Sequence, residues 1–211
     1  MKSMIKPSII ISLLLASASL NAFSQAQKEL QTDFAITKID ANLVKTPQIS
    51  IGIGPIKNTK SRDWLEVEVE FAWQPVRNDL KYTDELTFAY YILLNNKSAQ
   101  NPQNTLLTGQ VTHVAIAAGK GMRSVMYVSP RTLERFFEGR VPANIQVSIV
   151  DVGVTITKQG QLVAFKSLHG SGPWWSNYQQ TAGYVLNKNE TPFAPLFWDY
   201  YEAIKSRPAG L

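Results

Sequence analysis

The chain has 211 residues, a formal net charge of +5 and no cysteine. This length suits one domain with a sizeable hydrophobic core. The lack of cysteine excludes disulfides, zinc–thiolate sites and thiol catalysis, so core packing alone must hold the fold. The densest basic cluster, at Lys57, Lys60 and Arg62, fits a solvated loop. A nucleic-acid face needs a basic stripe with stacking aromatic residues, so we expect no nucleic-acid partner.

Residues 1–24 have the three-part layout of a secretory signal peptide. Lys2 and Lys6 precede an apolar run over residues 9–20, and small residues lead to a cut between Ser24 and Gln25. A membrane-spanning helix needs ~20 apolar residues, more than this run offers. We therefore expect export to the periplasm, the cell surface or the medium, with no stable membrane insertion of the mature chain. Residues 25–33 would form an N-terminal extension, and 34–211 a single domain.

Alternation of apolar and polar residues dominates the chain from Phe34 onward, most clearly over residues 64–73. There Glu66, Glu68 and Glu70 share one face, which we interpret as a solvated strand face rather than a cation site, because carboxylates spaced along a strand diverge. The apolar residues of this strand and of the next one are predicted to be buried: Leu65, Val67, Val69, Phe71, Trp73, Phe88 and Tyr90.

Further strands are predicted at 34–44 and 86–95, the latter central because both of its faces are apolar, with 48–53 as another candidate. Residues 106–117 and 122–128 are predicted to form a hairpin that turns at 118–121. A second hairpin is predicted for 145–157 and 161–168, turning at 158–160. The apolar phase slips within 145–157, which indicates a bulge or a strand that crosses between sheets.

Two short helices are predicted among the strands. Ser129 and Pro130 give a cap and a first helical residue for a helix near 130–138, with Gly139 as its stop. Thr191 and Pro192 repeat this signal for a helix near 192–205, where a strand is the alternative because Pro195 weakens a helix. The chain is thus predicted to be mainly β, an immunoglobulin-like β-sandwich without a disulfide, decorated by two short helices.

No pattern in the chain points to catalysis. The only imidazoles are His113, predicted to be structural within a strand, and His169, in a glycine-rich loop that lacks the strand–elbow–helix setting of a serine nucleophile. No spacing provides a metal site, and none singles out a pair of carboxylates for glycoside hydrolysis. We therefore expect a protein that is not an enzyme and holds no cofactor and no metal.

The most informative surface candidate is the polar, glycine-containing segment 172–178, which carries Trp174, Trp175 and Tyr178. Aromatic residues exposed on a loop can stack on sugar rings or anchor a protein partner. The simpler interpretation, which we favour, is that one tryptophan plugs the end of the sandwich core. Two adjacent tryptophans can also divide these roles between them.

The leader, the strand at 63–73, the loop at 172–178 and the aromatic tail at 193–201 together resemble a known group of proteins. These are the small immunoglobulin-like exported proteins encoded in pilus-associated gene clusters of gut Verrucomicrobia, whose globular domain is similar to that of archaeal type IV pilin-like proteins. A type IV prepilin is cut before its apolar segment, whereas the best cut here follows it. The resemblance therefore implies an accessory, adhesive or host-contacting role rather than that of a polymerising subunit.

These observations predict a non-catalytic extracellular structural or adhesion module, associated with a pilus or the cell surface. Its expected partners are other envelope or pilus proteins and further copies of itself. Self-association would use open strand edges or the aromatic-rich end, residues 174–178 and 193–201. The alternative is a carbohydrate-binding module that uses the loop with Trp174 and Trp175, in which case a glycan is the partner.

Overall fold

The computed structural model describes residues 33–48, 60–77, 79–95 and 104–206. The predicted signal peptide and nearly all of the candidate strand at 48–53 lie outside these residues. The described part falls within one compact unit, residues 32–211. Among its helices, none is long and apolar enough to cross a membrane.

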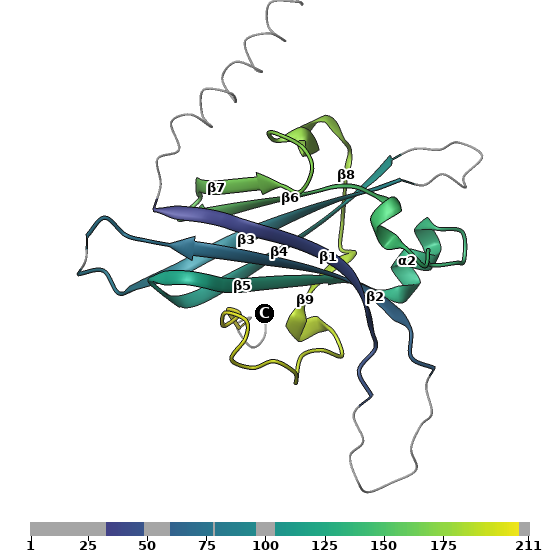
Figure 1. Cartoon of the computed structure of the whole chain (residues 1–211), viewed down its shortest axis with the longest axis horizontal. Coiled ribbons are helices and arrows are strands. Elements are labelled where there is room, and N and C mark those ends of the chain that lie inside the picture. Colours follow the sequence, from purple (N-terminus) through teal and green to yellow (C-terminus); the bar gives the residue numbers. More distant parts are fainter. Residues whose placement is uncertain (1–32, 49–59, 78, 96–103, 207–211) are drawn as a thin grey trace, which may run out of the picture. The chain divides into compact units, whose positions relative to one another are not determined.

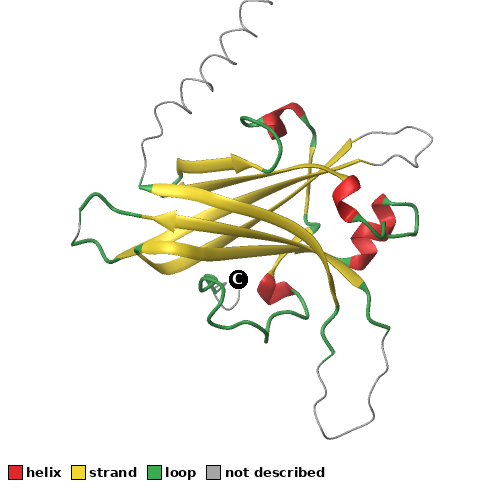
Figure 2. Ribbon diagram, viewed as in Figure 1, coloured by secondary structure: helices red, strands yellow, loops and turns green. Residues whose placement is uncertain are grey.

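Two sheets form the sandwich that the sequence predicts (Figures 1 and 2). The four-stranded sheet has the order β1 (Phe34–Lys45), β2 (Asp63–Trp73), β5 (Gly119–Val128) and β9 (Val185–Asn187). The five-stranded sheet has the order β7 (Gln161–Ser167), β6 (Ile149–Lys158), β3 (Tyr82–Asn95), β4 (Asn104–Ala117) and β8 (Gln180–Ala182). Neighbouring strands are antiparallel except the β4–β8 pair.

The core lies between the two sheets, and its composition confirms the predicted burial. All seven residues predicted to be buried are at most 2% exposed. Phe71 of β2 and Phe88 of β3 meet edge to face with ring centroids 4.8 Å apart, so the two sheets are in direct aromatic contact. The central position predicted for residues 86–95 is also confirmed, because β3 pairs with both β4 and β6.

The predicted hairpin between 106–117 and 122–128 is wrong. These segments are β4 and β5, which belong to different sheets, and the chain passes from one sheet to the other at Ala118, whose N–H donates to the carbonyl of Lys81 (2.9 Å). β4 pairs with β3 on one edge and with β8 on part of the other, whereas β5 pairs with β2 in the four-stranded sheet. Glycines at 119 and 121 mark the bend but do not specify which strands pair.

The second predicted hairpin, β6–β7, is confirmed. It turns at Gln159 and Gly160, which both have positive φ (50° and 78°), as a two-residue hairpin turn requires. The phase slip before it has two causes: residues Ile145–Val147 form a 3-10 turn, and the β3–β6 register shifts between Leu93 and Leu94. The turn and the bulge together account for the slip, and β6 does not cross between sheets.

One of the two predicted helices is present. Helix α2 (Pro130–Phe136) starts at the cap Ser129, whose side chain accepts a hydrogen bond from the N–H of Thr132 (3.2 Å). The predicted helix near 192–205 is wrong: after the 3-10 turn Lys188–Glu190, this segment forms irregular turns and one isolated bridge. We call residues 193–206 the C-terminal strap; it lies beside β5 at the yellow end of the chain (Figure 1).

The strap joins the two sheets through main-chain hydrogen bonds. Glu202 donates its N–H to the carbonyl of Arg123 on β5 (3.0 Å). On β4, the N–H of Val114 donates to Ala203, and Lys205 donates to Thr112 (2.9 and 2.8 Å). In a helix, the main-chain groups of the strap would bond to one another and leave those of the strand edges without these partners. The open edges of β4 and β5 therefore explain why the strap is extended over residues 202–205.

Candidate functional site

The aromatic loop singled out from the sequence lies on the outer face of the five-stranded sheet. Its 3-10 turn, Trp174–Asn177, buries Trp175, which is 7% exposed and stacks on Tyr91 of β3 with ring centroids 4.7 Å apart. Gly153 of β6 makes room for this ring, because a Cβ there would lie 2.3 Å from it. Trp175 thus covers the sheet from outside rather than plugging the end of the central core.

A buried carboxylate fixes the approach to this loop. Asp151 accepts hydrogen bonds from Ser167 Oγ (2.7 Å) and from the N–H groups of His169 and Gly170 (both 2.9 Å). Ser167 Oγ in turn accepts from the indole N–H of Trp174. His169 and Gly170 therefore stabilise the conformation of this loop through their main-chain N–H groups.

Trp174 and Tyr178, the other two residues singled out from the sequence, are half-buried. Their rings meet at 80° with centroids 6.1 Å apart, and Trp174 meets Trp175 at 77°. Rings so oriented do not provide one flat surface for a ligand. The structure thus brings the three predicted residues together, and most of their aromatic area packs against one another and the sheet.

A second concentration of aromatic residues lies on the C-terminal strap. Phe197, Trp198 and Tyr200 are 56%, 76% and 47% exposed, and we call them the aromatic patch. The strap that carries them is anchored by Phe193, which stacks on Tyr127 of β5 with ring centroids 4.5 Å apart. The indole N–H of Trp198 donates to the carbonyl of Pro195 (3.0 Å), so the most exposed ring is held in place.

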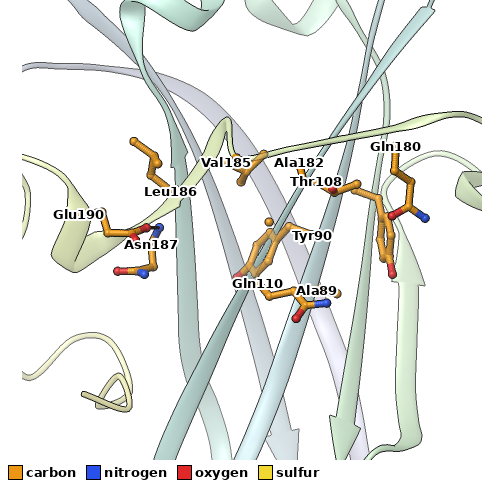
Figure 3. A pocket seen from close by; sticks show the side chains of 13 residues that line it. Ala89, Tyr90, Thr108, Gln110, Gln180, Ala182, Val185, Leu186, Asn187 and Glu190 are labelled. Atoms are coloured by element: carbon orange, nitrogen blue, oxygen red, sulfur yellow. Dashed lines mark hydrogen bonds between the residues drawn. The ribbon is translucent and has the colours of Figure 1, made fainter. Parts of the chain in front are cut away.

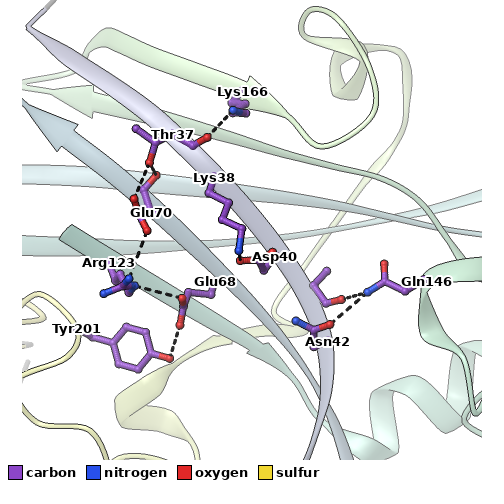
Figure 4. Close-up of polar contacts among 11 residues, drawn as sticks. Thr37, Lys38, Asp40, Asn42, Glu68, Glu70, Arg123, Gln146, Lys166 and Tyr201 are labelled. Carbon is purple, nitrogen blue, oxygen red and sulfur yellow. Dashed lines mark hydrogen bonds and ion pairs between the residues drawn. The ribbon is translucent and has the colours of Figure 1, made fainter. Parts of the chain in front are cut away.

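The strap also covers part of the row of glutamates on β2, Glu66, Glu68 and Glu70, which we call the carboxylate row. Figure 4 shows Glu68 and Glu70 with their partners. Arg123 forms ion pairs with Glu68 (3.4 Å) and Glu70 (3.3 Å), and its guanidinium lies 4.5 Å from the centroid of the Tyr200 ring. Tyr201 donates its hydroxyl proton to Glu68 (2.8 Å). The interpretation of this face as simply solvated is therefore wrong, because the strap and β5 bury the row halfway.

Glu66, at the other end of the row, accepts a hydrogen bond from the hydroxyl of Tyr127 (3.0 Å). Burial raises the pKa of its carboxyl group. It contributes to the lining of a groove of about 540 Å³ between the strap and the end of β1, which we call the aromatic groove. The groove is lined by Val44, Lys45, Pro47, Glu66, Phe193, Leu196, Phe197, Tyr200 and Tyr201.

Sequence reasoning placed Tyr201 in the aromatic-rich end but did not single out Arg123 or Tyr127 as parts of a site. The available signal was the alternation in 122–128, which puts Arg123 and Tyr127 on one face of β5. The wrong hairpin placed β5 beside β4, so this face was not recognised as lying next to the glutamates of β2. In the structure Arg123 lies opposite Glu70, and Tyr127 opposite Glu66.

His113 is a buried structural residue, as predicted, and is 1% exposed. Its Nδ1 lies 3.0 Å from the carbonyl oxygen of Glu202, and its Nε2 lies 2.7 Å from Ser124 Oγ, which accepts from the hydroxyl of Tyr90 (2.7 Å). A carbonyl only accepts, so Nδ1 carries the proton and Nε2 accepts from Ser124. Burial lowers the pKa of the imidazole to about 4, so it is neutral at pH 7.

A further cavity of about 470 Å³ lies between β4, β8 and the segment around β9 (Figure 3). Gln180 lies at one side of it, and Asn187 and Glu190 lie at the other. The chain closes tightly over Gly109, where a Cβ would lie 2.5 Å from the carbonyl oxygen of Val185. Within the described residues, no group of three or more His, Asp or Glu side chains is placed to hold a metal ion.

A protein-family model matches residues 25–208, which is most of the chain. The chain belongs to that family. Among solved structures, the crystal structure of a protein from Akkermansia muciniphila, a verrucomicrobium, is similar, with a TM-score of 0.71 and 24% sequence identity. The match covers 83% of this chain and 94% of that chain, and it shows a shared fold. No curated protein matches. The resemblance to verrucomicrobial proteins seen in the sequence thus holds at the level of the fold.

Proposed function

We propose that this protein is an exported, non-catalytic structural or adhesion module, associated with a pilus or the cell surface, that binds another protein through its aromatic patch. The observation that carries this proposal is the exposure of three large aromatic side chains on an anchored segment. Such residues are enriched at the centres of protein interfaces, where they bury much apolar area and lose little side-chain entropy.

The backbone of the patch supports the same proposal. Phe197 has a φ of 56°, in the left-handed region that side chains other than those of Gly, Asn and Asp rarely adopt. Such a conformation costs on the order of 1–3 kcal/mol and persists only where neighbouring structure imposes it. Here the strained residue presents its ring to solvent, as a binding surface requires.

Capture from envelope extracts tests this proposal. The bait is the purified exported protein, compared with the double variant Phe197→Ser/Trp198→Ser. The control variant is Tyr82→Ser, which removes a 67% exposed aromatic residue on β3, distant in sequence from the patch. We expect the wild type and Tyr82→Ser to retain the same pilus or envelope proteins, and the double variant to lose them. Equal retention by all three baits would contradict the role of the patch.

A glycan array separates the carbohydrate alternative from this proposal. Glycan binding that is lost in Trp174→Ala and kept in the double variant would favour a carbohydrate-binding module instead.

Export is tested by mass spectrometry of the natural protein, which should begin at Gln25 within a residue or two. A chain that still begins at Ile9 would contradict cleavage after the apolar segment.

A further inference from the structure

The carboxylate row on β2 is unequally neutralised along its length. Arg123 is shared by Glu68 and Glu70, whereas no ion pair reaches Glu66 among the residues that the structure describes. Lys45, which also lines the groove, pairs with Asp63 (2.7 Å). The position opposite Glu66 on β5 holds Tyr127 instead of a base, so within the described part of the chain this carboxylate is paired with a neutral hydroxyl.

Glu66 lies where an unpaired charge is costly. It is half-buried, and most groups around it in the aromatic groove are apolar or aromatic. A carboxylate that lacks water and a counter-ion is poorly stabilised. The attraction of an opposite charge placed beside it compensates for the lost hydration. The groove therefore favours a cationic group over a neutral or an anionic one.

The chain already shows which cation suits this surface. One step along the same face, the guanidinium of Arg123 joins carboxylates to the ring of Tyr200. A guanidinium is planar and weakly hydrated, so it stacks on aromatic rings while it pairs with a carboxylate, which an ammonium does less well. The aromatic groove shares the ring of Tyr200 with Arg123 and adds Glu66 and further aromatic rings, but its lining residues include no guanidinium.

We propose that the aromatic groove binds an arginine side chain of the partner protein, with Glu66 as its counter-ion and the aromatic rings of the groove around its stem and guanidinium. This inference rests on the proposed function and specifies the chemistry of its partner. A volume of about 540 Å³ accommodates one long side chain. The aromatic patch, which shares Phe197 and Tyr200 with the groove, would cover the apolar residues that flank the arginine.

Titration of the whole purified protein with capped amino acids, followed by NMR, tests the inference. The probes are N-acetyl-arginine methylamide, the lysine equivalent and the uncharged norleucine equivalent. We expect the arginine probe to shift the resonances of Tyr200 and Tyr201 and to bind ~10-fold more tightly than the norleucine probe, the factor that ~1.4 kcal/mol provides. Equal binding of arginine and norleucine would overturn a charge-selective site, and equal binding of lysine would overturn the choice of arginine.

Two isosteric variants locate the site. Glu66→Gln should weaken binding of the arginine probe ~10-fold, whereas Glu138→Gln, at an exposed glutamate after α2, should leave it unchanged. Unchanged thermal unfolding of Glu66→Gln establishes that the fold is intact. Binding that survives Glu66→Gln would overturn the inference. If the probe does not bind but the aromatic patch still captures envelope proteins, only the arginine assignment fails and the proposed function stands.

Discussion

His113 should make the stability of this protein fall as the pH is lowered from neutral. The imidazole lies in a hydrogen-bonded chain that joins Tyr90 of β3, Ser124 of β5 and the carbonyl of Glu202 in the strap. It therefore links the two sheets and the strap at one buried point. Protonation of Nε2 would replace the acceptor of the Ser124 hydroxyl by a second donor and bury a charge.

The sign and size follow from the two pKa values. The folded-state pKa is about 4, below the ordinary value of 6.5, so the unfolded chain binds the proton more tightly. This stabilising contribution is fully present above pH 6.5 and is lost as the pH falls from 6.5 to 4. At ~1.4 kcal/mol per pH unit, the loss amounts to about 3 kcal/mol. Glu66 and Glu202 act in the opposite sense, because burial raises the pKa of both carboxyl groups.

A variant comparison separates these contributions. Urea unfolding, followed by tryptophan fluorescence between pH 8 and pH 4, gives the free energy of unfolding of the wild type, His113→Gln and His169→Gln. His169 is the only other histidine and is exposed, so its variant should keep the wild-type pH dependence. His113→Gln should be less stable at pH 8, and the gap should shrink by about 3 kcal/mol towards pH 4. Parallel curves for the wild type and His113→Gln would refute the reasoning.

Three further predictions concern packing and assembly. Gly153→Ala should destabilise the fold by ~1–3 kcal/mol and alter tryptophan fluorescence, because its Cβ would meet the ring of Trp175; Gly119→Ala, with open space around its Cβ, should do neither. Val67→Asp should cost ~4 kcal/mol or prevent folding, as an unpaired buried charge does, whereas Val76→Asp at an exposed site should be nearly neutral in urea unfolding. Light scattering at micromolar concentration should show a homo-oligomer, and the average mass should be lower for the Phe197→Ser/Trp198→Ser variant. A mass of one chain at every concentration would contradict self-association.

The sequence predicted the layers of this fold better than its pairings. Alternation in 64–73 identified the buried face of β2 because that pattern depends on the strand itself. Which strands pair depends on edges that other segments leave open, and no local pattern encodes this. The turn at 118–121 shows the difference: its glycines predicted a change of direction correctly, but the next strand joined β2 instead of β4.

The same limit applied to the candidate site, and it explains how the aromatic patch arises. The cap signal at Thr191 and Pro192 favoured a helix locally, but main-chain groups at Thr112, Val114 and Arg123 needed partners that only an extended segment supplies. Once the strap is tied to both sheets, its side chains cannot all face inward. Phe193 packs against the sheet, and Phe197, Trp198 and Tyr200 are left at the surface. Their exposure is thus a consequence of how the sandwich is closed, and under the proposed function a bound partner would remove that apolar area from water.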